Sequence, residues 1–130
     1  MKSDEITVAD YMAAMAGQAA RDIVAERVRQ VVKEGWLPEH DDQHAGGEMA
    51  AAAACYCHPE PCMDDTRGVP FSWPWVRRWW KPTDRRRDLV KAVALILAEI
   101  ERLDRAARRD SAHDASQAVT DKEKEDDHGI

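Results

Sequence analysis

The chain has 130 residues and a formal net charge of −6, which suits one domain with a modest hydrophobic core. No stretch reaches the roughly 18 apolar residues of a membrane span, and no basic start followed by an apolar run indicates a signal peptide. Its three cysteines are an odd number, which favours a reducing compartment over a disulfide scaffold. We therefore expect a cytoplasmic protein with no membrane partner.

Charge is spread unevenly along the chain. Residues 73–109 contain eleven Lys and Arg against five Asp and Glu, whereas acids dominate residues 110–130. The net acidity therefore does not exclude an anionic ligand beside the basic segment. It argues against a nucleic-acid footprint over the whole surface, so nucleic acid is not an expected partner.

Apolar residues recur at helical spacing near the start of the chain and predict one long helix over about 8–34. Gly17 offers a place for a break in this helix, and Gly35 stands where a glycine commonly ends one. Charged residues fill the face opposite the apolar one: Arg21, Asp22, Glu26, Arg27 and Arg29.

Two further helices are expected. The alanine-rich segment 48–57 begins with an acid and predicts a short helix that a neighbouring helix can approach closely. A second long helix is expected over about 84–109, because five apolar residues follow the 4-3-4-3 spacing of a coiled-coil seam: Leu89, Val93, Ile96, Ile100 and Leu103. This face must be covered by another helix of the chain or by a second copy, so a homo-oligomer through the last helix is one expected arrangement.

The remaining segments lack a regular pattern. Four prolines between residues 58 and 75 exclude a regular helix there: Pro59, Pro61, Pro70 and Pro74. After Arg109 the apolar pattern stops, and the acidic segment 110–130 is expected to be disordered. The expected fold class is all-α, with two long helices, one short helix and an irregular Pro/Trp-rich connection in a single domain over 1–109.

The motif His40-Asp41-Asp42-x-His44 is the first candidate for chemistry. Two histidines at i and i+4 share a helix face and, with acids beside them, are able to ligate a metal. Pro38 and the glycines that follow disfavour an extended helix here. A capping loop, a set of ligand-contacting polar groups and a metal site therefore stay open as readings of this motif.

Cysteines form the second candidate. Cys55, Cys57, His58 and Cys62 place four soft ligands within eight residues, but structural zinc sites usually use the Cys-x-x-Cys spacing in separated pairs. Small buried residues at a helix end are the alternative reading. The sequence leaves open whether this group binds a metal.

Tryptophans beside basic residues form the third candidate. Four of the five tryptophans lie between residues 73 and 80, and the fifth is Trp36. Indole faces stack on nucleobases and arginines hold phosphates, so the segment is typical of a nucleotide pocket. Alternatively, the indoles fill space between helices while the arginines pair with nearby acids. We expect at least one indole to face a ligand.

Catalytic motifs are missing from the sequence. It contains no Gly-rich phosphate loop and no recognisable arrangement of Ser, His and Asp for a nucleophile. We therefore assign no catalytic residue, no metal ligand and no cofactor.

Two blocks resemble a group of uncharacterised phage and prophage proteins. They are Gly35-Trp36 followed by Glu39-His40-Asp41-Asp42-x-His44, and Trp79-Trp80-Lys81-Pro82 followed by the run from Asp84 to Ala92. The resemblance covers about residues 23–105. It implies a phage-type origin and carries no site residue.

A weaker resemblance is to the repeat domain of ryanodine receptors, which also occurs in bacteria. Gly35-Trp36, Asp41-Asp42, His44 and Lys81 with Asp84-Arg85 are similar to features of that domain. The segment Trp73-Pro74-Trp75 departs from the pattern of that domain. The resemblance implies a small helical fold with a pocket for an adenine-nucleotide-like ligand, in settings connected with cyclic nucleotide signalling and phage defence.

The leading hypothesis is a non-enzymatic protein that binds a nucleotide-like small molecule and sequesters a host defence signal. In this hypothesis the base stacks on Trp36 and on one or more of Trp73, Trp75, Trp79 and Trp80. Lys81, Arg85 and Arg86 hold phosphate, and Asp41, Asp42 or His44 accepts ribose hydroxyls, with His40 beside them in the ligand-contacting loop. The alternatives are an inhibitor or adaptor that binds a host protein through the Trp cluster, and a metal-dependent hydrolase built on His40, Asp41, Asp42 and His44.

Overall fold

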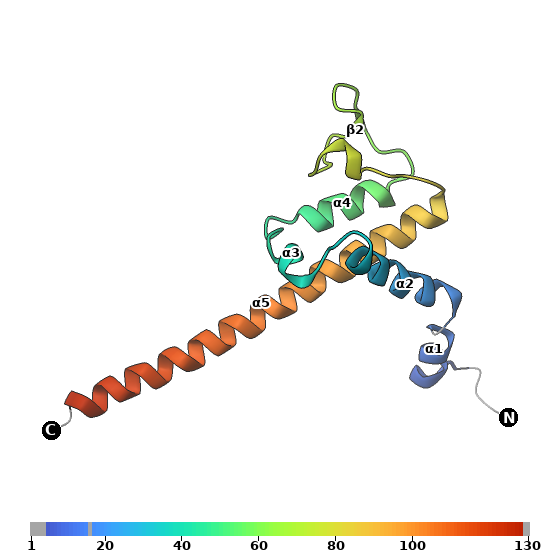
Figure 1. The fold of residues 1–130 in the computed structure, drawn as a ribbon. Helices are drawn as coiled ribbons and strands as arrows, with labels where there is room; N and C mark the ends of the chain where they lie inside the picture. Colours follow the sequence, from blue (N-terminus) through green and yellow to red (C-terminus); the bar gives the residue numbers. More distant parts are fainter. Residues whose placement is uncertain (1–4, 16, 129–130) are drawn as a thin grey trace. The chain divides into compact units, whose positions relative to one another are not determined.

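The computed structural model describes residues 5–15 and 17–128 and shows a small helical fold with very little strand (Figure 1). The fold class predicted from the sequence is confirmed. Helices of the described residues are α1 (Val8–Met15), α2 (Gln18–Val32), α3 (Pro38–Asp42), α4 (Glu48–Cys57) and α5 (Arg85–His128). None of these helices is long and apolar enough to cross a membrane.

The predicted first helix is divided in two. Helix α1 ends at Met15, and α2 begins at Gln18 with Gly17 as its N-cap, so the break falls at the glycine that offered one. Gly35 follows α2 with a φ of 74°, a left-handed conformation that favours glycine. This turn lets the amide of Trp36 donate to the carbonyl of Gln30 at 3.0 Å and directs the chain into α3.

Helix α2 buries the face that we predicted to be exposed. Glu26, Arg27 and Gln30 are buried, while Val28 and its neighbour Val24 are exposed. The assignment of faces from apolar spacing was therefore wrong at Glu26, Arg27 and Val28, whereas Ile23 and Val31 of the predicted apolar face are half-buried. The reason is that the buried charges of α2 find charged partners on other segments, which offsets the cost of removing them from water.

The segment 58–84 is irregular, as predicted. It contains an antiparallel pair of two-residue strands, β1 (Met63–Asp64) and β2 (Val69–Pro70), and a short 3₁₀ helix, η1 (Arg77–Trp79). Strands this short show no period-two pattern, so apolar spacing does not reveal them. Around them, the side chain of Arg67 donates to the carbonyls of Pro70, Phe71 and Trp73 and holds the turn together.

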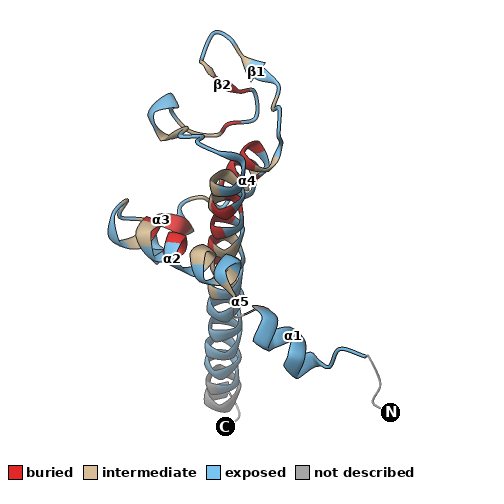
Figure 2. Ribbon diagram, turned by 90° about the vertical axis from the view of Figure 1, so that its right-hand side faces the viewer, coloured by how far each residue is buried: buried red, intermediate tan, exposed pale blue. Residues whose placement is uncertain are grey.

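The core lies where α4 meets the first part of α5. Figure 2 shows buried residues gathered on α4 and on the adjoining turns of α5, with a few on the segment around β2. Alanines on both helices allow the close approach that the alanine-rich sequence predicted. The buried cluster consists of Ala52, Ala53, Cys55, Tyr56, Val69, Trp73, Ala92 and Leu95.

Helix α5 is longer than predicted. Residues 110–128, which were expected to belong to a disordered tail, lie in α5, and residues 129–130 lie outside the described ranges. The segment is rich in strong helix formers and has no Pro or Gly before Gly129, so local propensity favours a helix without an apolar face. The chain divides into two compact units, residues 1–99 and residues 100–130.

The predicted seam of α5 is largely exposed. Its five apolar residues, Leu89 to Leu103 at the 4-3-4-3 spacing, are 36–51% exposed. The buried face of α5 instead carries smaller residues, with Ala92, Ala94 and Ala98 among them. Covering of the seam by a second copy stays a prediction.

Candidate functional site

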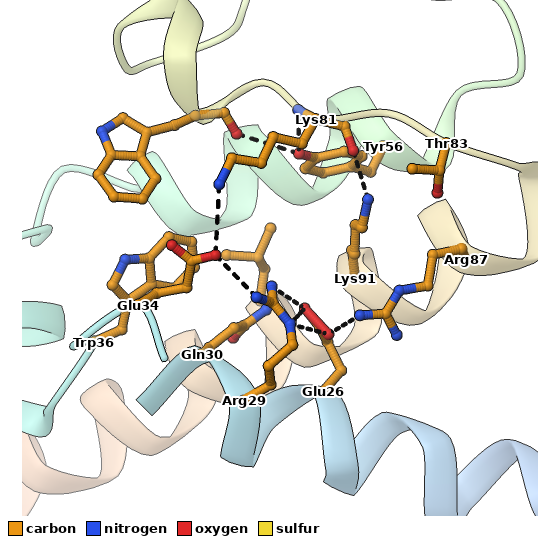
Figure 3. A pocket seen from close by; sticks show the side chains of 12 residues that line it. Glu26, Arg29, Gln30, Glu34, Trp36, Tyr56, Lys81, Thr83, Arg87 and Lys91 are labelled. Atoms are coloured by element: carbon orange, nitrogen blue, oxygen red, sulfur yellow. Dashed lines mark hydrogen bonds and ion pairs between the residues drawn. The ribbon is translucent and has the colours of Figure 1, made fainter. Parts of the chain in front are cut away.

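A cavity of about 350 Å³ opens between α2, α4, the segment after η1 and the first turns of α5 (Figure 3). Six of its twelve lining residues are charged, and we call it the charged cavity. Its polar lining consists of Glu26, Arg29, Gln30, Glu34, Tyr56, Lys81, Thr83, Arg87 and Lys91, with Trp36, Trp79 and Leu95 as apolar lining.

A buried carboxylate organises this cavity. Glu26 is 1% exposed and accepts hydrogen bonds from Arg29, at 2.8 and 2.9 Å, and from Arg87 of α5. Burial acts to raise the pKa of Glu26, but the hydrogen bonds and charges of Arg29 and Arg87 outweigh it and hold the pKa below its ordinary value. Arg29 also pairs with Glu34 at 2.9 Å, and its pKa is raised, chiefly by the hydrogen bond to Glu26.

Tyr56 fixes the segment that carries Lys81. Its hydroxyl donates to the carbonyl of Trp79 at 3.4 Å and accepts from the amide of Lys81 at 3.0 Å. Burial raises the pKa of Tyr56. The ammonium of Lys81 lies 3.6 Å from Glu34 and 5.4 Å from the centre of the Trp79 ring. Tyr56 of α4 thus positions the basic side chain of Lys81 at the cavity.

Lys91 enters the cavity from α5. Its ammonium donates to the carbonyl of Lys81, lies 3.8 Å from a carboxylate oxygen of Asp88 and sits 5.6 Å from the centre of the Tyr56 ring. Burial lowers the pKa of Lys91 because the charged form loses part of its hydration. An anion in the cavity would restore part of that lost interaction.

The charge of the cavity lining is positive. Four cationic side chains, Arg29, Lys81, Arg87 and Lys91, face two carboxylates, those of Glu26 and Glu34, which leaves an excess of two positive charges. Gln30 adds an unsatisfied group. It is 2% exposed, and within the described part of the chain its Oε1 atom is buried without a hydrogen-bond partner. Such a buried acceptor on a cavity wall suits a ligand that donates a hydrogen bond.

A second cavity of about 550 Å³ adjoins the first. We call it the aromatic groove, because rings from α3, its flanks and the segment before η1 form most of its wall. Trp36 and Trp79 line both cavities. The groove is lined by Trp36, His40, His44, Arg67, Pro74, Trp75, Val76 and Trp79.

The rings of the groove pack on one another at several angles. Trp36 stacks on His40 with 5.9 Å between centroids and an angle of 7°, and it lies 5.8 Å from Trp75 and 6.1 Å from Trp79 in tilted contacts. His44 lies 5.3 Å from Trp75. The indole Nε1 of Trp75 is buried, and no residue of the described ranges accepts its hydrogen. The groove therefore combines half-buried ring faces with one free donor.

The five tryptophans fall into two groups. Trp36, Trp75 and Trp79 line the groove, whereas Trp73 and Trp80 line neither cavity. Trp73 is 3% exposed, and its Nε1 donates to the carbonyl of Val76 at 3.2 Å. Trp80 packs against Trp73 and Tyr56, with centroids 5.0 and 4.7 Å away. Trp73 therefore belongs to the buried core, whereas Trp80 is half-buried and packs against that core, as Trp36, Trp75 and Trp79 also do.

The acids and histidines around α3 differ in position: the two histidines line the groove, and the two acids do not. Asp41 is 0% exposed and pairs with Arg27 of α2 at 2.7 Å, so it anchors α3 to α2. Asp42 is half-buried and lines neither cavity. His40 and His44 both line the groove, and their Nδ1 atoms lie 3.4 Å from Asp41 and 3.1 Å from Glu48.

Of the predicted basic residues, the structure brings only Lys81 to a cavity. Arg86 pairs with Asp22 of α2 at 2.8 Å, and Arg85 is exposed; neither lines a cavity. The next arginine, Arg87, lines the charged cavity in their place. Position along α5 decides this, since residues one and two apart point in different directions on a helix.

Most polar residues of the charged cavity were not predicted: Glu26, Arg29, Gln30, Glu34, Tyr56, Thr83, Arg87 and Lys91. They come from α2, α4, the segment before α5 and α5, and no local motif joins them. One signal was present in the sequence. Glu26, Arg29 and Gln30 lie three and four residues apart on α2 and so share a face.

No metal site is found in the described residues, since no three His, Cys, Asp or Glu side chains there gather closely enough to hold an ion. Cys55 is buried and its Sγ lies 3.3 Å from Ser72 Oγ, while Cys57 is half-buried and Cys62 is exposed. The three thiols are free.

Comparison of the chain with protein-family models, with curated proteins and with solved structures found no match. The resemblances to phage proteins and to the ryanodine-receptor repeat therefore stay predictions.

Proposed function

We propose that this protein binds a nucleotide-like small molecule without converting it, with the planar base held in the aromatic groove. The observation that carries the proposal is the convergence of three half-buried indoles, those of Trp36, Trp75 and Trp79, on one concave groove. Stacking on aromatic side chains contributes about 1–3 kcal/mol for each base. It tolerates many bases, because every base has a flat face.

The size and polarity of the groove support a small ligand. Its volume of about 550 Å³ falls in the range typical of small-molecule sites, which is roughly 300–1,000 Å³. The unpartnered Nε1 of Trp75 supplies a hydrogen-bond donor for an acceptor on the base. Rings with one directed polar group are the usual composition of such sites.

Binding without catalysis is proposed because the polar groups of the groove hold one another. His40 and His44 are directed at Asp41 and Glu48, and Asp41 is tied to Arg27. In the phage setting that the sequence resemblance implies, a binding protein of this kind would sequester a host signalling nucleotide.

Calorimetric titration of the full chain tests this proposal. Adenosine, guanosine, their mono- and diphosphates and cyclic nucleotides are titrated into protein whose helical circular dichroism and cooperative melting have been checked. We expect saturable heat with a stoichiometry near one for at least one compound. Folded protein that gives no heat with any of them contradicts the proposal.

A further inference from the structure

The charged cavity lies directly beside the aromatic groove and shares Trp36 and Trp79 with it. We infer that this cavity binds the phosphate of the same ligand, which makes the ligand a nucleoside phosphate rather than a nucleoside or a free base. The inference rests on the proposed function for the base. The phosphate site itself stands on the charged cavity alone.

The first argument is charge. The cavity lining has an excess of two positive charges, and both of its carboxylates are already engaged by Arg29. Glu26 also forms an ion pair with Arg87. The two carboxylates therefore hold the arginines in place and are not available to bind a cation. A group with two negative charges would complete the balance of this lining.

The second argument is that the two lysines have few hydrogen-bonding and charged partners. Lys91 is almost enclosed, at 11% side-chain exposure, and its ammonium forms a long ion pair with Asp88, at 3.8 Å. Lys81 likewise forms a long ion pair, with Glu34 at 3.6 Å. Each ammonium group has N–H donors left for a phosphate oxygen. Burial disfavours the charged form of Lys91 and lowers its pKa, so a nearby anion would stabilise that charge.

The third argument is the buried amide of Gln30. Gln30 lines the cavity and is 2% exposed, and its Oε1 atom, which is closed to solvent, has no partner among the residues that the structure describes. Leaving such an acceptor unsatisfied costs about 1–3 kcal/mol. A sugar hydroxyl between base and phosphate is the part of a nucleotide that donates to an acceptor of this kind.

The position of Lys81 joins the two cavities. Its ammonium lies 5.4 Å from the centre of the Trp79 ring, which is itself part of the groove. A phosphate held by Lys81 therefore lies next to the ring system proposed to hold the base. Arg85, which is exposed and lines neither cavity, has no part in this site.

Three probes separate the two cavities in a calorimetric titration of the full chain at about 0.15 M salt, where distant charges are screened. Adenosine tests the groove alone, pyrophosphate tests the charged cavity alone, and ADP tests both. The variants are Lys91→Met and Lys81→Met, which keep the length of the side chain and remove its charge. Arg85→Met is the matched control, and melting curves check the fold of each variant.

We expect ADP to bind the unmodified chain at least about tenfold more tightly than adenosine, as one or two charge-assisted hydrogen bonds provide. Each lysine variant should weaken ADP binding by about tenfold and adenosine binding by much less, and Arg85→Met should change neither. If Lys91→Met fails to fold, the exposed Lys81→Met carries the test. Pyrophosphate that binds the unmodified chain but not the lysine variants supports the phosphate site even if adenosine fails, an outcome that contradicts only the groove.

Equal affinity of the unmodified chain for ADP and adenosine overturns the phosphate site while base binding stands. The same holds if both lysine variants bind ADP as the unmodified chain does. Binding of none of the three probes overturns both.

Discussion

Replacing Glu26 by glutamine is expected to lower the free energy of unfolding by about 1–3 kcal/mol, because the carboxylate is buried while the arginines it pairs with are 36–39% exposed and keep part of their hydration. Glu26 is 1% exposed and holds Arg29 of its own helix and Arg87 of α5. Glutamine keeps the shape of the side chain and removes its charge. Two guanidinium groups would then face each other across a neutral amide in the wall of the charged cavity.

Urea denaturation of the unmodified chain, Glu26→Gln and Asp22→Asn measures this effect. Asp22 lies four residues earlier on α2 and pairs with Arg86 at 2.8 Å, so it also joins α2 to α5, but at the surface. The control should cost less than about 1 kcal/mol, because exposed ion pairs contribute little. Equal losses in the two variants would show that burial of Glu26 does not set the strength of this link.

The pH dependence of the same variant has a definite sign. Because the folded-state pKa of Glu26 lies below its ordinary value of 4.5, the stability from its charge is present above that pH. It is lost as the pH falls through the lower, folded-state pKa. The difference in stability between the unmodified chain and Glu26→Gln should therefore be constant near neutral pH and shrink only below about 4.5.

Truncation of the tryptophans should separate the core from the groove. Trp73→Ala is expected to cost about 3–5 kcal/mol, since it empties a fully packed site and removes the hydrogen bond to Val76. Trp75→Ala should cost only about 1–2 kcal/mol, because Trp75 is half-buried at the edge of the groove. The same Trp75 variant should weaken nucleoside binding by about 1–3 kcal/mol, the value of one stacked base.

Thermal melting and calorimetric titration of both variants measure the two effects. Phe71→Ala is the matched control, because Phe71 is an aromatic residue that is 62% exposed and lines neither cavity. It should change stability by less than about 0.5 kcal/mol and leave binding unaltered. A Trp75 variant that binds a nucleoside as tightly as the Phe71 variant would argue against the groove as the base site.

Local signals predicted much of the fold. Helix α4 spans residues 48–57 as expected, and α5 begins one residue after the expected start at 84. Gly17 and Gly35 mark the limits of α2 because their effect on the backbone is local. The buried face of α2 was not predicted because charged groups, not apolar ones, pair with the side chains on it. Glu26 meets Arg87 across 61 residues of sequence, a pairing that apolar spacing does not reveal.

The aromatic part of the site was also predictable, and the charged part was not. Residue type alone marks Trp36, His40, His44, Trp75 and Trp79 as candidate ligand contacts, and all five line the groove. Which tryptophans turn inward depends on the irregular segment around them, and the sequence left that open. The charged cavity draws Lys91 and Gln30 from separate helices, so only the packing of those helices brings them together.

Indole signals in a ¹H–¹⁵N correlation spectrum of the full chain test most directly whether the groove faces a ligand. The chain has five tryptophans, and each indole Nε1–H gives a separate signal that single-residue variants assign. On titration with ADP, the signals of Trp36, Trp75 and Trp79 should shift in a saturable way, with Trp75 shifting most. Those of Trp73 and Trp80 should stay nearly fixed. Shifts confined to Trp73 and Trp80, or no indole shift with ADP or any compound of the nucleotide panel, would contradict base binding in the groove.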